Sequence, residues 1–73
     1  LPIYGISEKI RKEVEGFRIF HQDVEFGCTL TLGLHAYQDS EGIEESINCA
    51  DMALYHGKRN GKNRSVWYEQ IQQ

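Results

Sequence analysis

The sequence predicts an α+β fold in the order helix, hairpin, helix, short strand, with the helices packed on an antiparallel sheet. Two observations lead to this fold class. Apolar residues recur every three to four positions in residues 1–15 and 43–60, which is the period of an amphipathic helix. Apolar and polar residues alternate one by one from Val24 to His35, which is the period of a strand. This order corresponds to half of a split βαβ sandwich, with both helices on one face of the sheet.

The first expected helix covers residues 1–15. Pro2 suits the first turn, where its missing N–H costs no hydrogen bond, and Gly16 is a suitable stop. The apolar face consists of Ile3, Ile6, Ile10, Val14 and Phe17.

A β-hairpin is expected over residues 18–37, with its turn at residues 21–23. One face of the long strand would be large and apolar: Val24, Phe26, Cys28, Leu30, Leu32 and Leu34. The other face would be mostly small or polar: Glu25, Gly27, Thr29, Thr31, Gly33 and His35. The second face either meets water or lets another element approach closely, and Gly33 indicates a bulge or a close backbone contact.

The second expected helix covers residues 43–60. Its apolar stripe consists of Ile43, Ile47, Ala50, Leu54 and Gly57. The small residues Ala53 and Gly57 would let this helix lie very close to a sheet, and Gly61 is a suitable left-handed stop. A short aromatic strand at residues 65–68 and a polar tail at 69–73 complete the expected elements.

Size and composition limit the function. The chain has 73 residues and a net charge of −3, which fits one small domain and argues against bulk electrostatic binding of nucleic acid. We expect no metal site, because neither Cys28 nor Cys49 has a partner at metal-ligand spacing, and no disulfide. The sequence has no long apolar run and no signal-peptide pattern, so we expect a cytoplasmic segment whose parent protein could be membrane-anchored upstream.

The concentrated chemistry lies between residues 58 and 64, which hold half of the eight Lys and Arg residues. Lys58 and Lys62 are four residues apart around a helix end, so their side chains could converge on one triphosphate. The alternative is two solvated cations that favour the helix dipole. Arg59 and Arg64 are expected to be surface charges, with Arg64 able to clamp a neighbouring carboxylate.

No catalytic residue is expected in this chain. Asp51 has no second carboxylate three or four residues further on. The three histidines are scattered over different elements, and none pairs convincingly with a Ser or Cys nucleophile. Residues 57–62 follow a helix, whereas a P-loop precedes one.

The pattern Ala50-Asp51-x-Ala53-Leu54-Tyr55-x-x-Lys58-x-x-Gly61-x-Asn63-Arg64 resembles the C-terminal signature of GGDEF-domain diguanylate cyclases. Upstream, Glu8-Lys9-Ile10-Arg11 resembles the family's helix before the last hairpin, and Thr29-Leu30-Thr31-Leu32-Gly33 resembles its Thr-x-Ser-x-Gly strand. The resemblance covers all 73 residues, somewhat less than half of a complete domain, and implies the nucleotidyl cyclase palm-like fold.

The resemblance further implies a protein that condenses two GTP into cyclic di-GMP, with one GTP on each subunit of an antiparallel dimer. Lys58 and Lys62 would contact the GTP phosphates, although the family usually has arginine at the second position. Lys9 falls where some members have an arginine that binds cyclic di-GMP at an inhibitory site, but lysine at this position also fits an ordinary exposed residue of the helix. Thr31 and Gly57 stand where the family often has serine and alanine.

The signature hairpin and the first-strand aspartate are not in this sequence. In the complete domain they would hold two divalent metals, Mg or Mn, so we expect the metal ligands outside this chain and the fragment alone to be inactive. We also expect the isolated half-domain to self-associate.

Two other functions remain open. The chain could be a degenerate, non-catalytic GGDEF-like signalling module that binds nucleotide or a protein partner. It could also be a small RNA-binding module that uses residues 58–64 with Trp67 and Tyr68, although the net negative charge argues against nucleic acid.

Overall fold

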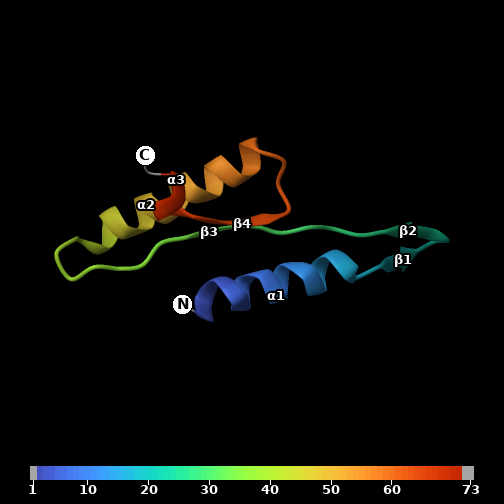
Figure 1. Cartoon of the computed structure of the whole chain (residues 1–73). Helices are drawn as coiled ribbons and strands as arrows, with labels where there is room; N and C mark the ends of the chain where they lie inside the picture. Colours follow the sequence, from blue (N-terminus) through green and yellow to red (C-terminus); the bar gives the residue numbers. More distant parts are fainter. Residues whose placement is uncertain (1, 72–73) are drawn as a thin grey trace.

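The computed structural model describes residues 2–71, and it confirms the α+β class (Figure 1). The elements are α1 (Pro2–Gly16), β1 (Ile19–His21), β2 (Val24–Phe26), β3 (Thr31–Leu34), α2 (Ile43–Arg59), β4 (Arg64–Trp67) and α3 (Tyr68–Ile71). The two main helices begin and end within one residue of the positions that the periodicity indicates, apart from Leu1, which lies outside the described residues.

Within the described residues the strands form two separate pairs. β1 and β2 make the expected antiparallel hairpin, whereas β3 and β4 pair in parallel, from Thr31 opposite Arg64 to Leu34 opposite Trp67. The antiparallel pairing is therefore confined to the hairpin, and the helices pack on the parallel pair. The reason is the connection, because a helical crossover such as α2 returns the chain in the same direction as the strand that it left.

The helices α1 and α2 lie on opposite sides of β3 and β4 (Figure 1). On the α1 side, the Ser7 hydroxyl bonds to the Ser65 hydroxyl at 3.0 Å, and Tyr4 stacks on Trp67 with ring centroids 6.4 Å apart. The expectation that both helices cover one face is wrong. The face of β3 that carries the small residues packs against α2 and does not meet water. Each face of the parallel pair is therefore buried against one helix.

The close approach of α2 explains the small residues. Ala53 is fully buried, and a Cβ added to Gly33 would lie 2.9 Å from the Leu54 Cα. A Cβ added to Gly57 would lie 2.9 Å from the Thr31 Cγ2 and 3.1 Å from the Val66 Cγ2. The interpretations of Gly33 as a close backbone contact and of the small stripe as a surface lying close to the sheet are confirmed.

The hairpin extends away from the rest of the molecule (Figure 1). Gln22 and Asp23 have φ values of 51° and 67°, which is the backbone of a two-residue hairpin turn, so His21 belongs to β1 and not to the turn. The long strand expected from Val24 onwards is interrupted between Phe26 and Thr31. Phe20 is 70% exposed, and the other apolar side chains of the hairpin, Ile19, Val24 and Phe26, are exposed as well.

The chain ends differently from the expected strand and polar tail. Tyr68 begins the short helix α3, and residues 72–73 lie outside the described range. None of the described helices is both long and apolar enough to cross a bilayer.

Candidate functional site

The turn that follows α2 presents both lysines to solvent. Lys58 lies in the last turn of the helix, and Lys62 follows in a left-handed conformation with φ 59°. The helix ends at Arg59, so Lys62 is placed by the turn and not by helical spacing. Both side chains are exposed, and neither forms an ion pair with a carboxylate of residues 2–71. The two ammonium groups are therefore available to an external anion.

The Gly57 carbonyl and Gly61 shape this turn. The Gly57 oxygen accepts hydrogen bonds from the Asn60 N–H at 3.2 Å and from the Lys62 N–H at 2.9 Å. Gly61 has φ 111°, a conformation that glycine adopts without steric cost, and it confirms the expected stop. The Gly57 carbonyl at the end of α2 thus accepts its hydrogen bonds from the segment that carries Lys62.

Asn63 ties the turn to the rest of the fold. Its N–H donates to the Thr31 hydroxyl of β3 at 3.1 Å. Its side-chain oxygen accepts from the Arg11 guanidinium of α1 at 2.8 Å, and its side-chain N–H donates to the Glu15 carboxylate at 2.6 Å. The position of Lys62 is consequently fixed one residue away by contacts to a strand and to the opposite helix.

Arg11 is itself held by Glu8. Its guanidinium donates to both carboxylate oxygens, at 2.8 and 2.9 Å, and the Ser65 N–H donates to the same carboxylate at 3.2 Å. The Arg11 bonds hold the pKa of Glu8 at about 2 against the opposing effect of burial, and Ser65 adds to the lowering. We call Glu8, Arg11, Glu15 and Asn63 the clamp. No sequence spacing indicates the clamp, although all of its residues but Glu15 lie in segments that carry the family resemblance.

The two remaining arginines of the segment do not act on carboxylates. Arg59 donates to the Tyr55 hydroxyl at 2.8 Å and lies 5.5 Å from the centre of that ring. Arg64 donates to the Lys62 carbonyl at 3.0 Å and forms no ion pair within residues 2–71, so the suggestion that it clamps a carboxylate is not supported. Arg11 performs that role instead.

Lys9 lies elsewhere. It is exposed on α1 and lines a shallow hollow of about 660 Å³ together with Lys12 and Tyr4. Neither Lys58 nor Lys62 lines this hollow.

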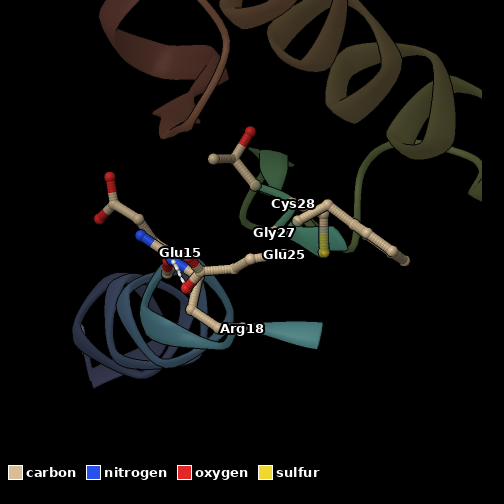
Figure 2. A pocket seen from close by; sticks show the side chains of 7 residues that line it. Glu15, Arg18, Glu25, Gly27 and Cys28 are labelled. Carbon is tan, nitrogen blue, oxygen red and sulfur yellow. Dashed lines mark hydrogen bonds and ion pairs between the residues drawn. The ribbon is translucent and has the colours of Figure 1, made fainter. Parts of the chain in front are cut away.

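A second hollow, of about 550 Å³, opens between the end of α1 and the segment that follows β2. Figure 2 shows Glu15 and Arg18 on one side, with Gly27 and Cys28 opposite. Arg18 donates to the Glu15 and Phe17 carbonyls at 2.7 and 2.9 Å. Its guanidinium is already engaged, and the candidate lysines do not line this hollow either.

A cluster that the sequence did not predict lies where β3 ends. His35 meets the Glu69 carboxylate at 2.6 Å through Nδ1 and the Glu41 carboxylate at 2.8 Å through Nε2. Burial opposes protonation of the ring, but these two carboxylates outweigh it and raise the pKa of His35. Cys49 of α2 completes a group of three ligand-type side chains. No linear spacing signals this group, because its members come from different elements.

This group does not fit Mg or Mn. Both ions prefer an all-oxygen ligand set, whereas a thiol and an imidazole make up two of the three side chains here. Within residues 2–71 no other three His, Cys, Asp or Glu side chains bring their ligand atoms close enough to hold one metal ion.

Comparisons with known proteins agree with this architecture. The family model described as "Diguanylate cyclase, GGDEF domain" matches residues 3–64. Diguanylate cyclase A from Treponema denticola is 37% identical over 61 residues, which cover 82% of this chain and 16% of that protein. The crystal structure of the GGDEF domain of DgcB from Caulobacter crescentus, in complex with c-di-GMP, matches with a TM-score of 0.86 and 27% identity, over 92% of this chain and 41% of that one. The chain thus spans less than half of either relative.

Proposed function

Because this chain belongs to the GGDEF-domain family of diguanylate cyclases, we propose that it forms the C-terminal part of a domain that condenses two GTP into cyclic di-GMP. Residues 3–64 match the family model, and this match is the observation that carries the proposal. The complete domain would work in the cytoplasm as a homodimer, with one GTP on each subunit.

In this proposal Lys58 and Lys62 bind the GTP phosphates. Both ammonium groups are exposed and unpaired with carboxylates of residues 2–71, and the clamp holds the backbone beside Lys62. An ammonium donates charge-assisted hydrogen bonds to phosphate oxygens, and two of them offset part of the triphosphate charge. Mg or Mn would neutralise the remaining charge, with ligands outside this chain.

The test uses the full-length protein that contains residues 1–73, supplied with GTP and magnesium. We expect cyclic di-GMP as the product. Lys58→Ala and Lys62→Ala should each raise the KM for GTP about tenfold or more, because a hydrogen bond to a charged group contributes roughly 1.5–3 kcal/mol. Lys12→Ala, an exposed lysine on α1, is the matched control. A full-length protein that makes no cyclic di-GMP would refute the catalytic proposal, and an unchanged KM in both variants would refute the lysine assignment.

The second candidate function is a non-catalytic module of the same family that binds nucleotide or a protein partner. Lys62 favours it, because lysine keeps the charge of the usual arginine but loses its bidentate fork. Binding of GTP or cyclic di-GMP to the full-length protein without turnover would support this function. Lys9 is tested only where the full-length protein makes cyclic di-GMP. If Lys9 acts at an inhibitory site, Lys9→Ala should weaken inhibition by cyclic di-GMP without changing the KM for GTP; unchanged inhibition would leave it as an ordinary exposed helix lysine.

A further inference from the structure

The cluster at the end of β3 has the composition of a transition-metal site. His35 follows β3, Glu41 lies in the loop that leads to α2, and Cys49 lies in the second turn of α2. We propose that these three side chains bind a zinc ion, with Glu69 orienting the imidazole. This inference concerns residues on which the proposed cyclase function does not depend.

The three ligand atoms are already close together. One atom each of His35, Glu41 and Cys49 lies within 4.8 Å of the other two. Tetrahedral zinc, with bonds of about 2.0–2.3 Å, places its ligands roughly 3.3–3.7 Å apart. The His35 Nε2 and the Glu41 oxygen, at 2.8 Å, would separate by about 0.5 Å to admit the ion. The Cys49 sulfur, at most 4.8 Å from both of these atoms, would approach them by no more than about 1.5 Å.

Both ring nitrogens of His35 face carboxylates, Nδ1 at 2.6 Å from Glu69 and Nε2 at 2.8 Å from Glu41. A carboxylate only accepts hydrogen bonds, so each contact places a proton on the ring nitrogen, and Nε2, which faces the proposed ligand Glu41, is the nitrogen that would exchange its proton for zinc. A carboxylate behind a ligating histidine is the usual outer partner in zinc sites, where it fixes the ring and raises its basicity. The Tyr68 ring packs edge-on against the imidazole at 5.4 Å and restrains its plane.

The Glu41 carboxylate is held as well, because the Gln38 N–H donates to it at 2.8 Å. The side chains of His35 and Glu41 are only 6% and 11% exposed. Ordering such side chains on binding costs little entropy when they are already fixed.

The donor set favours zinc over Mg, Mn or Ca. Nitrogen, sulfur and one carboxylate oxygen are typical zinc ligands, whereas the hard cations require several oxygens. Zinc would replace the proton on Nε2 and the thiol proton of Cys49, so binding releases protons. Three protein ligands leave a fourth position for water. The ion would join the 35–42 loop to α2 and, through Glu69, to α3, and would stabilise a small fold.

The test is zinc binding by the metal-free full-length protein, measured by competition with a chromophoric chelator, with zinc chloride as the sole added metal. We expect one zinc ion per chain. Cys49→Ser and His35→Gln should each weaken the affinity for zinc at least 100-fold. Glu69→Gln should weaken binding about 10-fold to 100-fold, as outer partners of ligating histidines do. Cys28→Ser is the matched control, because Cys28 is the other, exposed cysteine and should leave affinity unchanged.

Cobalt provides a second readout that does not depend on affinity. Co²⁺ bound through Cys49 should show a thiolate-to-metal absorption band that is present in the Cys28→Ser variant and absent in Cys49→Ser. Binding that survives both Cys49→Ser and His35→Gln would overturn the proposal. Absence of stoichiometric zinc binding by the unsubstituted protein would overturn it equally and would leave His35 as the centre of an ion-pair cluster.

Discussion

Thr31 and Gly57 both differ from the usual residues of the family. The two positions lie against each other where α2 packs on β3. The family often has serine and alanine at these positions, so this chain has gained one methyl group on β3 and lost one on α2. The Thr31 Cγ2 lies 2.9 Å from the place where an alanine Cβ at position 57 would stand. Relative to the usual family residues, a methyl group is therefore present on β3 and missing on α2 at one contact. We predict that substitutions at the two positions have coupled effects on the free energy of unfolding.

The magnitudes follow from this geometry. Gly57→Ala gains about 1 kcal/mol of helix propensity but forces an overpacked contact, which costs roughly 1–3 kcal/mol. Thr31 does not rotate away freely, because its hydroxyl accepts the Asn63 N–H at 3.1 Å. Thr31→Ser keeps that hydroxyl and loses one methyl group, which costs about 1 kcal/mol. The double substitution removes the contact with the Thr31 methyl group but keeps the contact with the Val66 Cγ2 at 3.1 Å, so it should be more stable than the sum of the two single effects predicts, with a coupling energy of about 1–3 kcal/mol.

The assay is urea unfolding of the four members of this double-mutant cycle. Trp67, the single tryptophan, lies in β4 and reports on packing by fluorescence, and circular dichroism reports on the helices. Each single substitution should lower the midpoint or leave it nearly unchanged, and the double variant should unfold at a higher urea concentration than the two single effects add up to. If the two single effects add to within about 0.5 kcal/mol in the double variant, the steric reasoning is refuted.

Two further predictions follow from the same packing. Gly33→Ala should lower the free energy of unfolding by roughly 3 kcal/mol, because its Cβ would meet the backbone of α2, while Gly5→Ala, with no atom near its Cβ, should be neutral or raise the stability by up to about 1 kcal/mol in urea titrations. The Glu8 carboxylate, with a pKa of about 2 in place of 4.5, stabilises the fold above pH 4.5 and loses this contribution as the pH falls toward 2. The shift sets an upper limit of about 3 kcal/mol, which solvent screening at this partly exposed pair reduces to about 1 kcal/mol. Glu8→Gln should therefore be less stable at pH 7 but match the original chain near pH 2; equal stability of the two at pH 7 would contradict the assignment.

Local patterns in the sequence predicted local features of the fold. The period of apolar residues located α1 and α2, and the small residues Gly33 and Gly57 indicated the close approach of α2 to β3. The parallel pairing of β3 with β4 was not predicted, because strand partners are chosen by the whole chain and alternation alone does not specify them. The assignment of both helices to one face failed for a related reason, since the small-residue face seemed too poor in apolar surface to bury.

The sites depend on distant parts of the sequence in the same way. Arg11 and Asn63 are 52 residues apart, and no spacing rule connects them before the fold is known. His35 and Glu69 are 34 residues apart and come into contact because β4 pairs with β3 and leads directly into α3. Metal-ligand spacing rules describe ligands on one turn or knuckle, so they do not detect a group assembled from a loop and two helices.

The family signature at residues 50–64 divides into two parts by burial. Ala53 and Gly57 are small because α2 touches the sheet, and Asn63 is an amide because it bonds both α1 and β3. Lys58 and Lys62 have no such structural reason, since both are exposed and without ion pairs in the described residues. Lys62 also adopts φ 59°, which costs a residue with a Cβ roughly 1 kcal/mol. A strained, exposed cation beside a fixed asparagine fits the proposed binding of the GTP phosphates, under which Lys62→Ala should change the KM for GTP and not the unfolding midpoint; a cation that only favours the helix dipole would give the reverse result.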